Sequence, residues 1–217
     1  TESWVQRMLT ITGVRTWREL RGESCICIDE LPHKQSICTS RSFPDGGLTN
    51  RADVEEALAN FAARCSSKMR RENTVCKAIS IFAYTNRFRP DLPTDYIYQT
   101  YYPLVPTSDL NEIVGYAVGM LRSAWKGDGK FNYKKAGVLV WNIVDSSPIQ
   151  GNLFDTFDRE KQAQLSRAID EINRKNGHNA IRMAVQGYSK KWHLKCEYIS
   201  KQYTTNIDDI IKLKLNK

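Results

Sequence analysis

Long apolar runs and the residue order of a signal peptide are both missing from this sequence. A membrane-spanning helix needs about 20 consecutive apolar residues, and candidates such as Val138 to Ile143 are only as long as a strand. The chain starts Thr1-Glu2-Ser3-Trp4, without an initiator Met and without a basic region followed by an apolar one. We therefore expect no membrane span, a cytoplasmic location, and a chain that is a fragment or a processed product.

Side chains that commonly hold metal ions are few and scattered. The chain has three histidines, and its six cysteines form no C-x-x-C pair. One residue separates Cys25 from Cys27, which is too tight for one arm of a zinc site, and no second pair completes it. We therefore expect no metal site and no disulfide framework. The cysteines are predicted to be reduced thiols, with Cys65 packed on the apolar face of a helix.

Motifs for catalysis are missing as well. Gly127-Asp-Gly129 lacks the flanking residues and the following helix of a phosphate-binding loop. Glu55 and Glu56 are adjacent, and neighbours on a helix diverge by about 100°. They are therefore expected to lie on solvated faces or at a helix cap rather than to share one ion. The sequence favours a binding module.

The balance of charge is basic. Lysine and arginine number 32 against 24 acidic residues, which gives a net charge of +8 and a pI near 9.2. Of this charge, +5 lies in residues 151–217. A basic surface favours a polyanionic partner, either nucleic acid or an anionic membrane surface. The alternative is a surface that is merely well solvated.

Strand and helix periods alternate along residues 35–144. Asn50 and Asp109 are suited to cap two helices, and the first of these carries one apolar stripe from Val54 to Met69. Strands are expected at 35–43, 76–85, 96–105 and 133–144. This β-α-β-β-α-β order predicts an α+β fold with a four-stranded antiparallel sheet, two helices on one face and the opposite face open.

The segments on either side of this domain follow other patterns. Residues 14–21 are expected to form a short helix that ends at Gly22, followed by an extended linker over 23–34. Asp145-Ser-Ser-Pro148 breaks the strand pattern and marks a boundary, after which a helix at 159–176 and a strand at 180–185 predict a small C-terminal α+β domain. The side of this helix that faces inward is expected to carry Ala163, Leu165, Ala168, Ile169 and Ile172.

Hydroxyl groups and cations gather on the predicted open face. The strand at 35–43 offers small donors, which suit phosphate oxygens as backbone N–H groups do. The candidates on this strand are Ser36, Thr39, Ser40, Arg41 and Ser42, and the nearby cations are Lys34, Arg87, Arg89, Lys134 and Lys135. An ordinary solvent-exposed strand is the alternative.

Four tyrosines follow on the next strand, namely Tyr96, Tyr98, Tyr101 and Tyr102. We favour packing in the core or on the sheet as their role. The other use is to stack on the bases of a single strand, because aromatic side chains on an open sheet can bind unpaired bases.

Four segments, in this order, resemble a known family. They are Arg18-Glu-Leu-Arg-Gly-Glu-Ser-Cys25, Lys34-Gln-Ser-Ile-Cys-Thr-Ser-Arg-Ser-Phe43, Lys135-Ala-Gly-Val138 and Asn152-Leu-Phe-Asp155. The sequence is similar to the UmuC-type catalytic subunits of bacterial DNA polymerase V, which are Y-family translesion polymerases, over nearly the whole chain.

The resemblance implies a domain plan. Residues 1–34 would be the end of the thumb and a tether, 35–144 the DNA-binding little finger, 145–157 a linker, and 158–217 the UmuC-type C-terminal domain. The palm, with its acidic ligands for Mg²⁺, would lie upstream of Thr1, so this chain is expected to be inactive alone and to need no cofactor. A single-strand-binding module and a protein-interaction scaffold remain the alternatives.

The same resemblance implies partners. The little finger would hold the damaged primer-template through phosphates, without reading its sequence, with Lys34, Ser36, Thr39, Ser40, Arg41, Ser42, Arg87 and Arg89 as the contacts. Residues 150–154 are similar to the sliding-clamp-binding pentapeptide of bacterial polymerases, in which Gln150, Asn152, Leu153 and Phe154 would contact the clamp. A buried interdomain plug is the alternative for Leu153 and Phe154. The polymerase V accessory subunit and the recombinase filament are further implied partners, and a membrane is not.

Overall fold

The computed structural model describes residues 1–25, 33–148, 151–155, 157–177, 179–189, 191–194 and 198–211. The chain divides into a first unit, residues 1–34, and a second unit, residues 35–217. Among the described residues, no helix combines the length and the apolar character that crossing a membrane requires.

The first unit contains one helix, α1 (Glu2–Glu19), which is interrupted by a non-helical conformation at Thr10. The expectation of a short helix starting near residue 14 is therefore wrong, because the helix already begins at Glu2 and an Arg18–Glu2 ion pair links its two ends. Apolar side chains of its first half do not form one buried stripe, which is why the helical period there is weak. Gly22, with φ +87°, follows the helix as expected.

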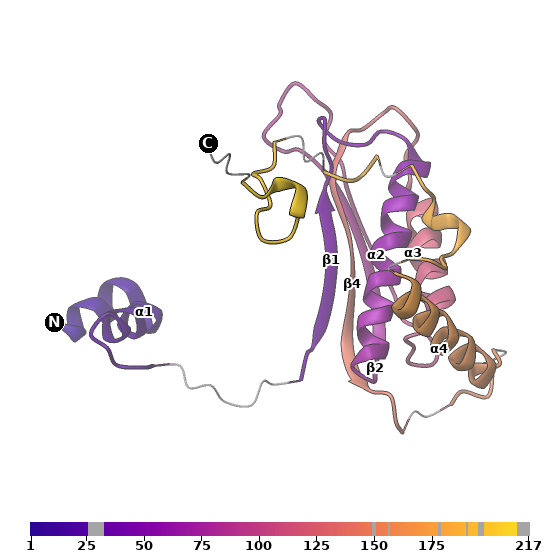
Figure 1. Ribbon diagram of the computed structural model, residues 1–217, viewed down its shortest axis with the longest axis horizontal. Helices are drawn as coiled ribbons and strands as arrows, with labels where there is room; N and C mark the ends of the chain where they lie inside the picture. The colour runs from indigo at the N-terminus through magenta and orange to yellow at the C-terminus, as the bar shows by residue number, and fades with distance from the viewer. Residues whose placement is uncertain are drawn as a thin grey trace, which may run out of the picture. The chain divides into compact units, whose positions relative to one another are not determined.

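The second unit is built on one antiparallel sheet. Its strands are β1 (Ser36–Ser42), β2 (Thr74–Thr85), β3 (Tyr96–Tyr101) and β4 (Tyr133–Asp145), and they lie in the order β1-β4-β2-β3. Two long helices, α2 (Arg51–Arg71) and α3 (Leu110–Ala124), lie side by side on one face (Figure 1). The predicted α+β architecture is thus confirmed, although β3 ends four residues earlier than the strand expected to reach Val105.

Local chemistry explains where the two long helices begin. The Asn50 side chain accepts a hydrogen bond from Ala52 N at 2.8 Å, and the Asp109 side chain accepts from Asn111 N and Glu112 N at 2.8 and 3.0 Å. These contacts satisfy amides that have no partner inside a helix.

The core lies between the sheet and these helices. Side chains that recur along α2 and α3 meet the alternate residues of β2 and β4 that point toward them. Cys65 on α2 is fully buried, as predicted, and the described cysteines (Cys25, Cys38, Cys65 and Cys76) are free thiols. The largest fully buried side chains include Tyr133, Phe43, Phe61, Leu58, Met69, Ile79 and Ile81.

The C-terminal part contains the helix α4 (Arg159–Asn176) and two short 3₁₀ turns, η1 (Ala184–Gln186) and η2 (Ile207–Asp209). The strand expected at 180–185 is wrong, because this segment ends in η1. The ends of α4 are as expected, since the Asp158 side chain caps its first turn and Gly177, with φ +95°, follows its last.

The predicted inward face of α4 is wrong in most of its members. Ile169 is partly buried against the core, but Leu165 is 47% exposed, and Ala163, Ala168 and Ile172 are exposed as well. Polar contacts fasten this helix instead, and the inward residue is Ser166. The contacts are Asp170 with Arg70 at 2.7 Å, Arg159 with Glu112 at 3.2 Å and Ser166 with Asp109 at 3.1 Å. Because polar side chains of α4 contact α2, α3 and the residue that caps α3, the apolar periodicity of this segment did not predict which side of the helix is buried.

Candidate nucleic-acid interface

The face of the sheet turned away from α2 and α3, here called the open face, is defined by strand register. Strand residues point alternately to the two faces. Ile37, Ile81 and Val138 point to the buried core, so their direct neighbours point to the open face. Its side chains come from all four strands: Ser36, Cys38, Ser40 and Ser42 on β1, Lys135, Leu139 and Trp141 on β4, Ser80, Phe82 and Tyr84 on β2, and Tyr96, Tyr98 and Thr100 on β3.

One half of the open face, on β1 and β4, is polar. Ser36, Ser40 and Ser42 lie in a row along β1, and Lys135 lies opposite Ser42 on β4. Since β1 is an edge strand, half of its backbone N–H groups point away from β4. Hydroxyls, outward amides and an ammonium group therefore occupy one side of the sheet, which is a set of donors suited to phosphate oxygens.

Thr39 and Arg41 do not belong to this face, and their predicted place among the open-face donors is wrong. Thr39 Oγ1 lies 3.3 Å from Cys65 Sγ on α2, and the Arg41 guanidinium lies 5.6 Å from the centre of the Trp192 ring. The physical reason is the two-residue period of a strand, which sends 39 and 41 to the face opposite 40 and 42.

The other half of the open face, on β2 and β3, is aromatic. Tyr96 and Tyr98 stack with ring centres 6.3 Å apart, and Phe82 and Tyr84 stack at 6.1 Å. Tyr96 is 63% and Tyr98 48% exposed. Of the favoured roles, packing in the core is wrong for Tyr96 and Tyr98, whereas packing on the sheet fits their stacking on each other.

The two remaining tyrosines differ from one another. Tyr101 points to the helix side and stacks on Tyr116 of α3 at 4.2 Å, which is the packing role that the sequence favoured. Tyr102, just beyond β3, stays largely exposed with one edge against Trp141 at 5.9 Å. The sequence predicted Phe82 as a buried strand residue and assigned no role to Tyr84 or Trp141. Alternation with their buried neighbours could have placed all three on the open face.

Gly137 joins the two halves of the open face. A Cβ at this position would lie 2.5 Å from Ser40 Cβ and 2.5 Å from Cζ of the Phe82 ring. The Phe82 ring thus covers the glycine, and any side chain there would push the aromatic half away from the polar half.

A pocket of about 740 Å³ lies at the end of the sheet, beside the open-face residues Tyr84 and Tyr96. Arg87 and Lys134 line it, so these two predicted cations lie near one end of the open face. Arg89 is different, because its guanidinium pairs with Asp91 at 2.6 Å. This hydrogen bond lowers the pKa of the Asp91 carboxyl to about 2. Lys34 is exposed and belongs to the first unit.

The acidic pair on α2 is engaged rather than solvated. Glu55 is buried and bridges Arg122 on α3 at 2.9 Å and Arg51 at 3.0 Å. Glu56 accepts hydrogen bonds from Ser189 and Trp192 at 2.9 and 3.1 Å. The two carboxylates diverge as predicted, but the expected solvated positions are wrong. In the part of the chain that the structure describes, no group of three or more His, Cys, Asp or Glu side chains could hold a metal ion.

The segment with the predicted clamp motif is exposed where it is described. Leu153 is 94% and Phe154 80% exposed, so the alternative of a buried plug does not fit. The Asn152 side chain accepts a hydrogen bond from Phe154 N at 2.9 Å, which shapes a short turn that displays both apolar side chains. Gln150 lies outside the described residues.

These features define a class of α+β domain in which two helices cover one face of a four-stranded antiparallel sheet and the other face carries exposed polar and aromatic side chains. Residues 34–153 match the C-terminal domain of the impB/mucB/samB family, and residues 163–213 match a domain of unknown function, DUF4113. Since the first match covers more than half of the chain, the chain belongs to the impB/mucB/samB family.

Relatives agree with this assignment. The chain is 35% identical to protein UmuC of Salmonella typhimurium over 215 residues, 98% of this chain and 50% of the relative. It is 34% identical to protein MucB of Escherichia coli over 205 residues, 93% of this chain and 47% of the relative. A DNA polymerase IV of Clostridium acetobutylicum is 24% identical over 138 residues, 64% of this chain and 33% of the relative. The chain spans about half the length of the UmuC and MucB relatives.

Proposed function

We propose that this chain is the DNA-gripping and clamp-docking portion of an error-prone translesion DNA polymerase that acts on damaged DNA in the cytoplasm. The observation that carries the proposal is the polar half of the open face, with its row of serines beside Lys135 on an edge strand. Family membership, and a relative named DNA polymerase IV, support the polymerase context.

The chemistry of this face suits a grip that ignores sequence. Hydroxyls and backbone amides bond phosphate oxygens, and an ammonium group neutralises their charge. Contacts to phosphate fix the position of the DNA and carry no information about its sequence. A polymerase that must pass damaged bases needs this kind of contact. Ser36, Ser40, Ser42 and Lys135 are the proposed open-face contacts, with Lys34, Arg87 and Arg89 as further cations.

The reaction itself is proposed to belong to other domains. Template-directed nucleotidyl transfer uses two divalent metal ions held by carboxylates, and we assign these to a palm domain that holds Mg²⁺. This chain alone is therefore proposed not to polymerise. The polymerase accessory subunit and the recombinase filament remain proposed partners of the C-terminal region.

Duplex binding by the full chain tests the grip. We expect weak binding that does not depend on sequence and whose affinity falls steeply with salt. Lys135→Gln should make the log-log salt slope shallower by about 0.9, the value for one lost phosphate contact. Fluorescence anisotropy over a series of salt concentrations measures the affinity for duplex and its dependence on salt. Lys161→Gln on α4, which removes the same charge from an exposed site, is the matched control. Affinity that is independent of salt would exclude this grip, as would equal losses in the two variants.

A single-strand-binding module remains the second candidate, because Tyr96 and Tyr98 are exposed on the open face. Aromatic faces of this kind can stack on unpaired bases. Tyr98→Leu should then weaken binding to a single strand more than binding to a duplex. If the wild-type chain binds primer-template duplex more tightly than a single strand, the result supports the duplex grip and excludes this second candidate. If salt-sensitive DNA binding is absent, a protein-interaction scaffold replaces both.

Clamp docking rests on Leu153 and Phe154. Two adjacent exposed apolar side chains on a short turn suit a small apolar pocket on a partner. Gly151, where the clamp-binding pentapeptide usually has Leu, removes one contact and adds backbone freedom, so the affinity should be modest.

The double variant Leu153→Ala/Phe154→Ala tests the docking proposal. It should abolish binding to the sliding clamp in surface plasmon resonance and leave the melting temperature nearly unchanged, because both side chains are exposed. Clamp binding that survives in this variant would refute the docking role. A loss of several kcal/mol of stability would instead reveal a buried pair.

A further inference from the structure

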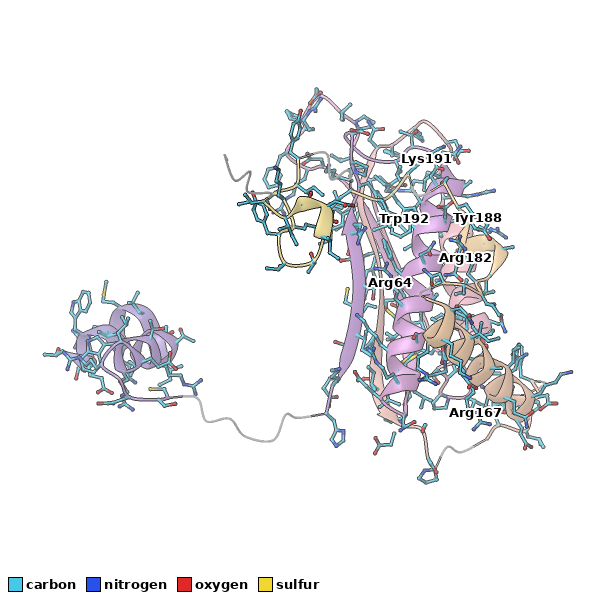
Figure 2. All side chains as sticks on the ribbon, viewed as in Figure 1. Arg64, Arg167, Arg182, Tyr188, Lys191 and Trp192 are labelled. Carbon is cyan, nitrogen blue, oxygen red and sulfur yellow. The ribbon has the colours of Figure 1, made fainter. Side chains whose placement is uncertain are left out.

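Residues 186–189 and 191–192 lie along one side of α2 (Figure 2). Asn60 Nδ2 donates to Gln186 O at 2.7 Å, Trp192 Nε1 donates to Glu56, and Lys191 Nζ lies 3.3 Å from an Asp53 carboxylate oxygen. Asp53, Glu56 and Asn60 are spaced by three and four residues, which places them on one stripe of the helix. The segment therefore follows this stripe along the first half of α2.

Two close contacts fix the segment on the helix. Trp192 is 3% exposed and meets Phe61 edge to face, with ring centres 5.3 Å apart. Gly187 approaches so closely that a Cβ there would lie 2.1 Å from Glu56 Oε2. The segment is thus a packed part of the second unit rather than a loose tail.

This docking changes the charge of the stripe. Its first half carries the acidic Asp53 and Glu56, whereas its second half continues, at the same helical spacing, with Arg64 and Arg71. The docked segment bonds both carboxylates and adds Lys191 beside Asp53. This side of α2 consequently presents cations along its length instead of an acidic and a basic half.

The cations of this stripe are available to a partner. Arg64 and Arg71 are exposed, and neither forms a hydrogen bond or ion pair with any residue that the structure describes. Arg182, which precedes the docked segment, donates to Gly187 O at 2.9 Å and holds its guanidinium 3.6 Å from the centre of the Tyr188 ring. Tyr188 is 77% exposed.

We propose that Arg64, Arg71, Arg182, Tyr188 and Lys191 form a second surface, the α2 surface, that binds single-stranded nucleic acid. Cations interleaved with an exposed aromatic ring are the features that bind a flexible phosphate backbone and its unpaired bases. At 1.5 Å per residue, the stripe from Asp53 to Arg71 is about 27 Å long, enough for several nucleotides. An acidic protein would use the cations but not the exposed ring. The α2 surface lies on the helix side of the sheet, so it is independent of the grip on the open face.

The test compares the affinity of full-length variants for a short fluorescent oligothymidylate. Arg64→Gln/Arg71→Gln should make the salt slope shallower by about 1.4, since each contact to a single strand contributes about 0.7. Tyr188→Leu should weaken binding about tenfold. Arg7→Gln/Arg15→Gln and Trp4→Leu, all on α1, are the matched controls and should bind as the wild type does. Ultraviolet cross-linking should attach the oligonucleotide to the peptide that contains Tyr188.

The outcomes separate this proposal from the proposed grip. Lys135→Gln should weaken duplex binding and leave oligothymidylate binding unchanged. Oligothymidylate affinity that does not change in the Arg64/Arg71 variant would overturn the α2 surface, as would cross-links confined to β3. Equal losses for duplex and single strand in that variant would also overturn it, because the surface would then lack the proposed selectivity.

Discussion

At the scale of single residues, strand alternation decides which side chains can act together. Ser40 and Ser42 share the open face with Lys135, whereas Arg41 between them points to Trp192. The chemistry of each candidate on β1 could be recognised from the sequence. The direction in which each side chain points depends on which residues of β1 face the core, and the sequence of β1 does not show this by itself. Whether a basic residue on a strand can contact DNA at the open face therefore depends on the side of the sheet to which it points, as well as on its charge.

The cysteines differ in burial, and we therefore expect them to differ in reactivity. Burial raises the pKa of the Cys65 thiol to about 11 and that of Cys76 to about 12, so neither forms the reactive thiolate near neutral pH. Cys38 is exposed on the open face. An alkylating reagent should therefore label Cys38 quickly and reach Cys65 and Cys76 only after denaturation, as peptide mapping by mass spectrometry would show. Rapid labelling of Cys65 in the native chain would contradict its place in the core.

Close packing across the open face makes a second residue-scale prediction. Gly137→Ala should destabilise the fold by about 1–3 kcal/mol, because the new methyl group overlaps Phe82 and Ser40. Urea unfolding followed by circular dichroism measures this loss. Gly115→Ala on α3, where an added Cβ meets nothing within 4 Å, is the control and should be neutral or stabilising. A neutral Gly137→Ala would mean that Phe82 does not cover this glycine.

At the scale of elements, local signals predicted well wherever one simple cause governed the structure. Asn50 and Asp109 cap the helices they were expected to cap, and the apolar stripe of α2 does face the sheet. The failures share a different cause. On α4, ion pairs to α2 and α3 decide which side is buried, in place of the apolar stripe. At 180–185, a turn is favoured over a strand because Asn173 bonds Ile181 and Gln186 bonds Asn60. Such long-range polar contacts leave no periodic mark in a sequence.

The boundary expected near Asp145 remains a prediction, and proteolysis tests it. Chymotrypsin should cut first between about Asp145 and Asp158, with Leu153 and Phe154 as its exposed sites. The fragments can be identified by mass spectrometry. If the first cuts fall instead within α2 or α3, the boundary is misplaced.

At the scale of the whole molecule, the second unit has two different surfaces. The open face carries serines and aromatic rings on the sheet side, and the α2 surface carries arginines on the helix side. The separation predicts that a duplex and a single strand can be held at the same time. Lys135→Gln should therefore change only duplex binding, and Arg64→Gln/Arg71→Gln should change mainly single-strand binding.

Mapping of the backbone amides upon addition of a primer-template duplex tests the grip through the open face. In nitrogen-15 NMR spectra of the full chain, the largest shifts should fall on β1 and β4, at Ser36, Ser40, Ser42 and Lys135, and should fade as salt is added. Amides of α3, on the covered side of the sheet, should stay in place. Shifts that concentrate on α3 or α4, with β1 unchanged, would contradict a grip through the open face.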